Sequence, residues 1–479
     1  MTAESASLSS LSTPLSEVDS TDIKPQLALP RALDAALFFD TCARLSNELD
    51  EAVHQSQVSM LPGFTLRPKG NERGRFLVID LGGSTLRICV VDLTGDGAYA
   101  MLAENSWVIS DTEKVIDAGF FRMIATKAAD TVGHLFKQDE LVHTGITWSF
   151  PIEQSNPDNG VVNVVSKGYT LGADIAGQDL KHVFEHALLK TGGLHAQVDS
   201  IINDAVAVYV SGLYTHGCTF GLVLGTGINA SISVPKRELG SRLTRDHLDR
   251  HIGDEVVLNA ELSFFGSSMA SHATPLDVAM HRAWESDLET FPAHLTDTFG
   301  CFQPLEFMCS GRYVSELVRL ALVEAEIFSP LSKGLLVPYS LSGEVVCKVY
   351  ESNDLVKSRE IFLAEYPDLA VQQYGEYEYA IIRDAIDAVI SRAALMLAAA
   401  LVSTTDFIRQ IHGSDSPLAD KVGYVGSLLR HFKSYRSKVD FYLELAAARN
   451  GRPKVDLVHI DNSSVLGAAI SAGSYLETI

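Results

Sequence analysis

The strongest constraint on the fold is a unit that occurs twice: an apolar run, a glycine turn and a second apolar run. The first unit covers residues 76–91 (FLVIDLGGSTLRICVV) and the second covers residues 220–234 (FGLVLGTGINASISV). Short apolar runs bounded by turn residues are typical of buried strands, so each unit predicts a strand–turn–strand hairpin. No Gly-Lys-Ser/Thr triplet follows the glycines, which argues against a strand-to-helix P-loop. Two such units indicate an internally duplicated α/β architecture, with helices covering each sheet.

The rest of the chain continues this alternation of strands and helices. Further strands are predicted over residues 144–150, 198–202, 422–425 and 455–460, and helices over 33–58, 205–214, 306–326, 377–402 and 467–475. A chain of 479 residues is too long for one ordinary core, so we expect two domains. The longest apolar run, Ala393–Val402, is too short to span a bilayer and is predicted to belong to a core helix.

Composition narrows the classes of partner. The formal net charge is −22, from 60 acidic and 38 basic residues, and such a surface repels nucleic acid and anionic membranes. Neutral sugars are compatible with it, whereas a nucleotide needs local basic residues or a metal ion. The six cysteines form no CxxC pair and have no zinc-ligand spacing, which favours reduced thiols in a cytoplasmic protein. Residues 1–24 are rich in Ser and Thr and carry acidic charge, so we expect a disordered tail and not a transit peptide.

The first glycine turn carries the groups that a phosphate requires. Gly82-Gly83 removes side chains where an anion must approach the backbone closely. Ser84-Thr85 supplies hydroxyl donors, Arg87 supplies fixed positive charge, and Asp80 is a candidate to hold Mg²⁺ through water. The alternative for this turn alone is a plain hairpin.

The second glycine turn, Gly225-Thr226-Gly227, has the same features and the same alternative. A nucleotide needs donors for several phosphates, and a site with two lobes can divide that task between two turns. The occurrence of both turns in one chain therefore favours a nucleotide site.

Asn203-Asp204 comes directly after the strand predicted over residues 198–202. A carboxylate at the carboxyl end of a strand is where α/β enzymes place reacting groups. Asp204 would align a sugar hydroxyl and accept its proton late, as the γ-phosphoryl group arrives. The alternative is that Asp204 only caps the helix that begins at Ala205, since Asp is a favoured N-cap. The dipeptide alone leaves both interpretations open.

Three further residues are candidates to contact a sugar. Lys167 could donate to the sugar or to the charge that builds up on the transferred group, and its alternative is a solvated lysine in a turn. Glu261 and Glu306 could accept from sugar hydroxyls, and their alternative is an ordinary loop or helix acid. Glu306 has apolar neighbours on both sides, which suggests burial, and a buried carboxylate requires hydrogen-bond donors.

Taken in order along the chain, these motifs resemble those of the hexokinase family. The matching motifs are LGGSTLR (81–87), Ser149-Phe150-Pro151, Ser166-Lys167-Gly168-Tyr169, Asn203-Asp204, GTGIN (225–229), Asn259-Ala260-Glu261, Glu306 with Ser310-Gly311, Gly426-Ser427, and Asp461 with Gly467-Ala468-Ala469. The resemblance covers the chain from about residue 30 to its end. An ordered set of this length does not arise by chance.

Several motifs depart from those of the glucose-phosphorylating members of the family. The departures are Ser84-Thr85 for Thr-Asn, Ser166 and Tyr169 in the Thr-Lys-Gly-Phe motif, Ala205 for Thr, Asn259-Ala260-Glu261-Leu262-Ser263 for Asn-Thr-Glu-Trp/Tyr-Gly, and Asp461-Asn462-Ser463-Ser464 for Asp-Gly-Ser-Gly. This variant set is similar to that of the fungal N-acetylglucosamine kinases. Leu262-Ser263 in place of a bulky aromatic residue and glycine, together with Ser166, predicts a wider pocket for the C2 acetamido group.

The resemblance implies two actin-like (ribonuclease H-like) α/β domains that close over a sugar in a central cleft. It implies a small domain of residues 71–203 plus 465–479 and a large domain of residues 25–70 plus 204–464. The implied reaction is ATP-dependent phosphorylation of the 6-hydroxyl of N-acetylglucosamine, with Asp204 as general base and Lys167 beside the transferred group. The implied sugar ligands are Ser149, Phe150, Ser166, Lys167, Asn203, Asp204, Asn229, Glu261 and Glu306. The implied ATP contacts are Gly82, Gly83, Ser84, Thr85, Arg87, Gly225, Thr226, Gly426 and Ser427, with Asp80 near Mg²⁺.

Two alternative functions stay open at this point. One is a broad hexokinase or glucokinase, and the other is a catalytically silent, sugar-binding regulator. The departures at Thr85, Ala205 and the loop after Asp461 keep the regulator open, whereas the retention of Asp204 and Lys167 together favours an active enzyme. A monomer and a dimer are both compatible with the sequence.

Overall fold

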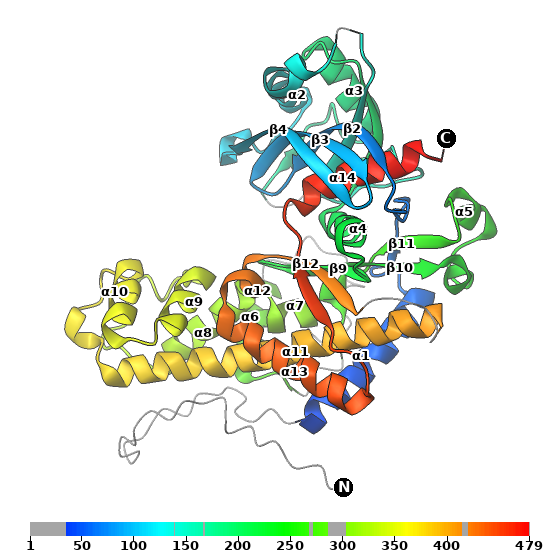
Figure 1. Cartoon of the computed structure of the whole chain (residues 1–479). Helices are drawn as coiled ribbons and strands as arrows, with labels where there is room; N and C mark the ends of the chain where they lie inside the picture. The colour runs from blue at the N-terminus through cyan, green and yellow to red at the C-terminus, as the bar shows by residue number, and fades with distance from the viewer. Residues whose placement is uncertain are drawn as a thin grey trace.

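The computed structural model describes residues 35–137, 139–165, 168–267, 272–285, 303–413 and 420–478. The tail expected over residues 1–24 lies outside these ranges, as do Ser166 and Lys167. Two β-sheets, each covered by helices, make up the described fold, and the C-terminal helix lies next to the sheet of the N-terminal half (Figure 1). The division of the chain at the expected domain boundaries stays a prediction.

The sheet of the N-terminal half has five strands in the order β4-β3-β2-β6-β8. Strands β2, β3 and β4 pair antiparallel, and β2, β6 and β8 pair parallel. The strands are β2 (Arg73–Leu81), β3 (Thr85–Gly95), β4 (Ala98–Val108), β6 (Val142–Trp148) and β8 (Ala196–Ile202). The first predicted hairpin is thus confirmed as β2–β3, with the glycine turn between its strands.

The second sheet has six strands in the order β1-β11-β10-β9-β12-β13. Its strands are β1 (Leu61–Pro62), β9 (Phe220–Leu224), β10 (Ile228–Pro235), β11 (Glu255–Asn259), β12 (Lys421–Val425) and β13 (Asp456–His459). Without the short edge strand β1, this sheet repeats the first in strand order and direction: three antiparallel strands, then two that pair parallel. The predicted duplication is therefore confirmed. A separate two-stranded sheet joins β5 (Val115–Ile116) to β7 (Thr170–Leu171).

Helices cover both sheets. Two helices pack on the outer face of the five-stranded sheet: α2 (Ala118–Val132) and α3 (Leu180–Lys190). Apart from α4 and α14, which are described below, the other helices are α1 (Ala35–Gln55), α5 (Arg245–Arg250), α6 (Pro275–Glu285), α7 (Pro304–Cys309), α8 (Gly311–Glu324), α9 (Gly343–Ser352), α10 (Leu355–Glu365), α11 (Glu376–His412), α12 (Ser427–His431) and α13 (Lys433–Asn450). Helix α11 is long and apolar enough to cross a membrane, but 83% of its most apolar window is buried inside the fold. It is the core helix that the run Ala393–Val402 predicts.

Two equivalent helices lie between the sheets (Figure 1). Helix α4 (Asp204–His216) follows the last strand of the first sheet, and α14 (Ser463–Leu476) follows the last strand of the second. They approach so closely that a Cβ added to Gly467 would lie 2.5 Å from the carbonyl oxygen of Ala207. On the other side of α14, a Cβ added to Gly145 would lie 2.3 Å from the carbonyl oxygen of Ala468. These glycines let α14 contact both α4 and the first sheet, and any larger side chain there would push the backbones apart.

The prediction of a single helix over residues 306–326 is wrong, because the structure has two helices there, α7 and α8. Ser310 between them has extended backbone angles, with φ −83° and ψ 156°. Its Oγ donates to the carbonyl of Thr226 at 2.9 Å, and the Gly311 N–H donates to the carbonyl of Gly225 at 2.8 Å. The break thus fastens the second glycine turn to the start of α8, an interaction that helical periodicity does not reveal.

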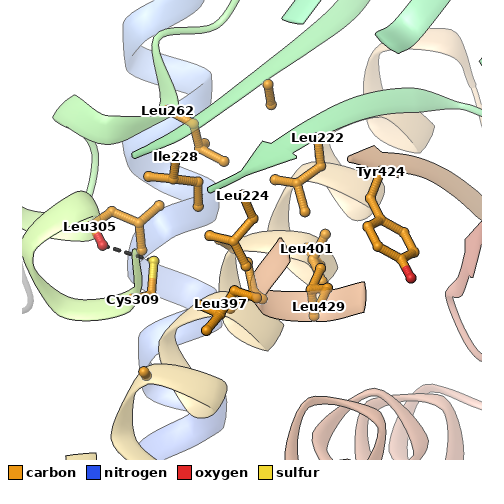
Figure 2. Packing of buried hydrophobic residues seen from close by; sticks show 14 of the residues in the cluster. Leu222, Leu224, Ile228, Leu262, Leu305, Cys309, Leu397, Leu401, Tyr424 and Leu429 are labelled. Carbon is orange, nitrogen blue, oxygen red and sulfur yellow. Dashed lines mark hydrogen bonds between the residues drawn. The ribbon is translucent and has the colours of Figure 1, made fainter. Parts of the chain in front are cut away.

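The largest apolar core lies on and around the second sheet. Figure 2 shows part of it, where side chains of β9, β10, α7 and α11 meet, with Leu224 among them. The described cysteines are all free, and four of the five are buried. Burial raises the pKa of the thiols of Cys42, Cys89 and Cys218 to about 12, so these side chains behave as small apolar residues.

Candidate active site

The first glycine turn is flanked by an ion pair. Asp80 and Arg87 are direct cross-strand partners on β2 and β3, and Arg87 Nη2 lies 2.7 Å from Asp80 Oδ2. Ser464, in the first turn of α14, donates to the same oxygen at 2.9 Å. Burial raises the pKa of the Asp80 carboxyl, while Arg87 and Ser464 oppose the shift and nearby Asp204 adds to it. Asp80 is thus a 7% exposed carboxylate held between a cation and a hydroxyl, within electrostatic range of the proposed base.

The first glycine of each turn, Gly82 or Gly225, is not required by the fold itself. A Cβ added to Gly225 would meet no heavy atom within 4 Å, and one added to Gly82 would meet only the carbonyl oxygen of Thr85, at 3.5 Å. Neither residue has a positive φ. A glycine that neither strain nor packing demands is explained by the close approach of a ligand to the backbone. This observation fits the expectation that phosphates lie over these turns.

We therefore expect Gly225→Ala to separate stability from ligand binding. Because the added methyl meets open space within the protein, the free energy of unfolding should stay within about 0.5 kcal/mol of the wild-type value. Because the same methyl occupies the surface that the phosphates approach, the Kd of the magnesium–nucleotide complex should rise at least about tenfold. Denaturant titration and calorimetry measure the two quantities. Unchanged nucleotide affinity in a stable variant would remove Gly225 from the site.

Asn203 and Asp204 differ in how they contribute to capping α4. Asn203 is the N-cap of α4: its Oδ1 accepts from the N–H groups of Ala205 at 2.8 Å and Val206 at 3.2 Å. Asp204 is the first residue of the helix, and its Oδ1 accepts from the Ala205 N–H at 2.8 Å. The capping interaction therefore belongs chiefly to Asn203. Asp204 stands at the end of β8, at the start of a helix that contacts both sheets.

A second polar cluster joins the β9–β10 hairpin to the end of β11, the segment after it and α7. Asn229 Nδ2 donates to Asn259 Oδ1 at 2.9 Å, and Asn259 Nδ2 donates to Glu261 Oε1 at 2.8 Å. Glu306 Oε2 accepts from the Ile228 N–H at 3.1 Å. Glu261 is held in the left-handed region, with φ +48° and ψ 55°. A non-glycine residue in that region is strained, and such strain concentrates at functional sites. The structure thus brings together the predicted sugar ligands Asn229, Glu261 and Glu306.

Glu306 has an unusual acidity. Burial raises its pKa to about 7, Glu261 adds to the shift, and the Ile228 N–H and Arg312 oppose it. The space for this carboxylate comes from Gly227, where an added Cβ would lie 2.6 Å from Oε2. Its predicted burial is met only in part, since Glu306 is half-buried.

The pKa of Glu306 predicts a pH-dependent sugar affinity. Below pH 7 the carboxyl is mostly protonated, and a protonated acid is a weaker acceptor for a sugar hydroxyl than a carboxylate is. We expect sugar to bind about tenfold more weakly at pH 6 than at pH 8, in proportion to the ionised fraction. Calorimetry across this range measures the effect, and Glu306→Gln, which cannot ionise, should abolish the slope. Equal affinities at both pH values would contradict the assignment.

The remaining predicted residues lie in different environments. Phe150 is 5% exposed and packs against Trp148 and Tyr169, with ring centroids 5.4 and 4.9 Å away, so its ring belongs to the core. The Ser149 N–H donates to the carbonyl of Leu81 at 3.2 Å, which places Ser149 beside the first turn. Thr85 begins β3, and exposed Ser84 precedes it in the turn after Gly83. The predictions for Ser166 and Lys167 fall outside the described residues.

Gly426-Ser427 lies against the second turn. Gly426 has φ +123°, and a Cβ on it would lie 1.8 Å from the carbonyl oxygen of Leu224. Here the fold itself requires glycine, in contrast to Gly225. Ser427 follows as the first residue of α12. The predicted ATP contacts Gly225, Thr226, Gly426 and Ser427 thus lie together at the carboxyl ends of the neighbouring strands β9 and β12.

Leu262 and Ser263 are both buried, and their predicted effect on pocket width stays a prediction. Leu262 is 3% exposed and points into the apolar core towards Ile228 (Figure 2). Ser263 is 2% exposed, and its Oγ accepts from Gln303 Nε2 at 3.2 Å.

Sequence reasoning missed two residues of the site. Arg312 lies exposed in the first turn of α8, next to the second glycine turn, with its guanidinium 4.6 Å from the ring centroid of Tyr339. Ser464 contacts Asp80 and Arg87 from the other end of the chain. The departure of residues 461–464 from the family pattern was the only signal for Ser464, and nothing in the sequence singled out Arg312.

Comparison with known proteins agrees with this geometry. The hexokinase family model matches residues 30–214 and 219–474. N-acetylglucosamine kinase 1 of Candida albicans is 36% identical over 440 residues, covering 87% of this chain and 86% of the relative. Glucokinase-1 of Saccharomyces cerevisiae is 27% identical over 455 residues, covering 86% and 87%. The chain belongs to the hexokinase family, and its activity is that of a sugar kinase.

The solved structures agree on the fold. The hexokinase of Schistosoma mansoni complexed with glucose has a TM-score of 0.73 at 24% identity, covering 92% of this chain and 96% of that one. A second hexokinase crystal structure has a TM-score of 0.74 at 21% identity, covering 94% and 98%. The two-domain actin-like fold expected from the motifs is confirmed.

Proposed function

We propose that this protein transfers the γ-phosphoryl group of ATP to the 6-hydroxyl of N-acetylglucosamine and forms N-acetylglucosamine 6-phosphate. The observation that carries the choice of sugar is the identity of 36% to the Candida albicans N-acetylglucosamine kinase 1, against 27% to the yeast glucokinase over a similar length. The motif departures support the same branch of the family. The proposal places the reaction in the cytoplasm.

Asp204 is the proposed general base. Negative charge is favourable at a helix N-terminus, and Asp204 is the first residue of the 13-residue helix α4. An alcohol is a very weak acid, so the carboxylate orients the 6-hydroxyl and accepts its proton late, as the bond to phosphorus forms. Lys167 is proposed to stabilise the charge on the transferred group.

The cluster of Asn229, Asn259, Glu261 and Glu306 is proposed to bind the sugar hydroxyls. Each hydroxyl can donate to a carboxylate and accept from an amide, and the asparagine-to-glutamate chain provides both kinds of partner. Asn203 is fixed by cap bonds through Oδ1, and since no hydrogen bond among the described residues uses its amide nitrogen, that group is proposed to donate to the sugar or its acetamido group.

The nucleotide is proposed to lie over the two glycine turns, where added side chains at Gly82 and Gly225 would block its approach. Among the described residues no group of three His, Cys, Asp or Glu side chains could hold a metal ion. Mg²⁺ would therefore be held mainly by the phosphates, with Asp80 contributing through water. Because the described bonds to Asp80 all use Oδ2, its Oδ1 is the oxygen proposed to face that water. The ion would neutralise charge on the transferred phosphoryl group.

The test is a coupled assay of ADP release with N-acetylglucosamine, glucose, mannose and fructose, each with ATP and Mg²⁺. The proposal expects the highest kcat/KM with N-acetylglucosamine. A higher value for glucose would make the protein a broad hexokinase. ADP release from none of the sugars, with sugar binding intact by calorimetry, would make it a regulator.

A further inference from the structure

One serine joins four elements beside the first glycine turn. Arg87 Nη2 donates to Ser464 Oγ at 2.5 Å, and Ser464 Oγ donates to Asp80 Oδ2 at 2.9 Å. The backbone carbonyl of Ser464 accepts from Thr147 Oγ1 at 2.8 Å. Ser464 therefore connects the first turn of α14 to β2, β3 and β6 at once.

The direction of these bonds is fixed by chemistry. A guanidinium only donates, so the serine oxygen must accept from Arg87, and its single proton is left for the Asp80 carboxylate. Asp80 is 7% exposed, so a lost donor is replaced by water only with difficulty. The hydroxyl of Ser464 therefore contributes to holding the Asp80 side chain in place.

A second contact supports this arrangement. Asn462, directly before α14, is held in the left-handed region with φ +51°, and its Oδ1 accepts from Arg87 Nη1 at 3.5 Å. The start of α14 thus presents two oxygens to one guanidinium. The cluster of Asn229, Asn259, Glu261 and Glu306 is built from β10, β11, the segment after β11 and α7, and its described hydrogen bonds include none of those to Ser464 or Asn462.

We propose that Ser464 is a positioning residue that holds Asp80 and Arg87 ready for the magnesium–nucleotide complex. The inference rests on the proposed function, because that function assigns Asp80 and Arg87 to the nucleotide. Loss of the hydroxyl would free Arg87 and Asp80 to pair in other geometries. Nucleotide affinity then falls while sugar affinity is retained.

The experiment compares Ser464→Ala with Ser464→Thr, which keeps the hydroxyl, and with Ser463→Ala. Ser463 is the neighbouring residue in the same helical turn, and no side-chain hydrogen bond is described for it, so it controls for the effect of alanine there. Calorimetry with a non-hydrolysable ATP analogue and Mg²⁺ gives the nucleotide Kd, and titration with N-acetylglucosamine gives the sugar Kd. We expect Ser464→Ala to raise the nucleotide Kd about tenfold, with the sugar Kd unchanged, and Ser464→Thr to restore binding.

Three results would overturn the inference: wild-type nucleotide affinity in Ser464→Ala, equal losses in Ser463→Ala, or a parallel loss of sugar and nucleotide affinity. Weak nucleotide binding in Ser464→Thr would contradict the role assigned to the Ser464 hydroxyl. A wild-type protein that binds the nucleotide but phosphorylates no sugar would refute the proposed function, and the binding comparison would still decide the role of Ser464. If the wild-type protein does not bind the nucleotide, both fail.

Discussion

Replacing Asp204 with asparagine should lower kcat about 10²- to 10⁴-fold, the range typical for loss of a general base. The asparagine oxygen can still accept from the Ala205 N–H, as Asp204 Oδ1 does at 2.8 Å, so the start of α4 should stay intact. Sugar and nucleotide affinities should change little, because proton transfer is the function that is removed. The coupled ADP assay gives kcat, and a thermal melt checks the fold.

The matched control for this variant is Asp354→Asn. Asp354 also stands at a helix start, where its side chain accepts from the Lys357 N–H as the N-cap of α10. The kcat of the Asp354→Asn variant should equal that of the wild type. A kcat for Asp204→Asn within threefold of the wild-type value, in a folded protein, would remove Asp204 from the chemistry.

Replacing Arg392 with alanine should cost about 3–5 kcal/mol in the free energy of unfolding. Arg392 on α11 holds Asp277 on α6 through bonds of 2.6 and 2.7 Å, and the two side chains are 1% and 9% exposed. Burial alone would raise the pKa of Asp277, but Arg392 and Thr274 reverse the shift and lower it. Without Arg392 the buried carboxylate loses its counter-charge. Urea denaturation measures the change.

The contribution of this pair to stability should also depend on pH. Because the pKa of Asp277 is lowered in the folded state, the contribution is present above the ordinary aspartate pKa and is lost as the pH falls through the lowered value. The control is Lys348→Ala, which breaks the exposed pair with Glu344, whose side chains are 57% and 72% exposed. That variant should lose less than about 1 kcal/mol. A similar loss of unfolding free energy in the two variants would mean that burial does not make the Arg392–Asp277 pair more stabilising than an exposed pair.

The sequence predicted those parts of the fold that depend on local pattern. The hairpins around both glycine turns and the start of α4 follow from short apolar runs, which mark buried strands wherever they occur. The partial burial of Glu306 could likewise be predicted from its apolar neighbours. Asn203 and Asp204 were the harder case, because both are good caps and only the backbone geometry shows which one has that role.

Contacts between distant segments could not be predicted in this way. The helix break at Ser310 depends on bonds to the turn at Gly225 and Thr226, and helical periodicity contains no information about that turn. The bond from Ser464 to Asp80 joins residues 384 positions apart. The place of Leu262 in the apolar core likewise depends on contacts that its neighbours in the sequence do not reveal.

The position of α14 also has a consequence for biosynthesis. The ribosome makes the strands of the first sheet, residues 73–202, long before it makes α14, which packs on β6 through Gly145 and Ala468. The face of the sheet that α14 covers therefore lacks this helix until residues 463–476 have been synthesised.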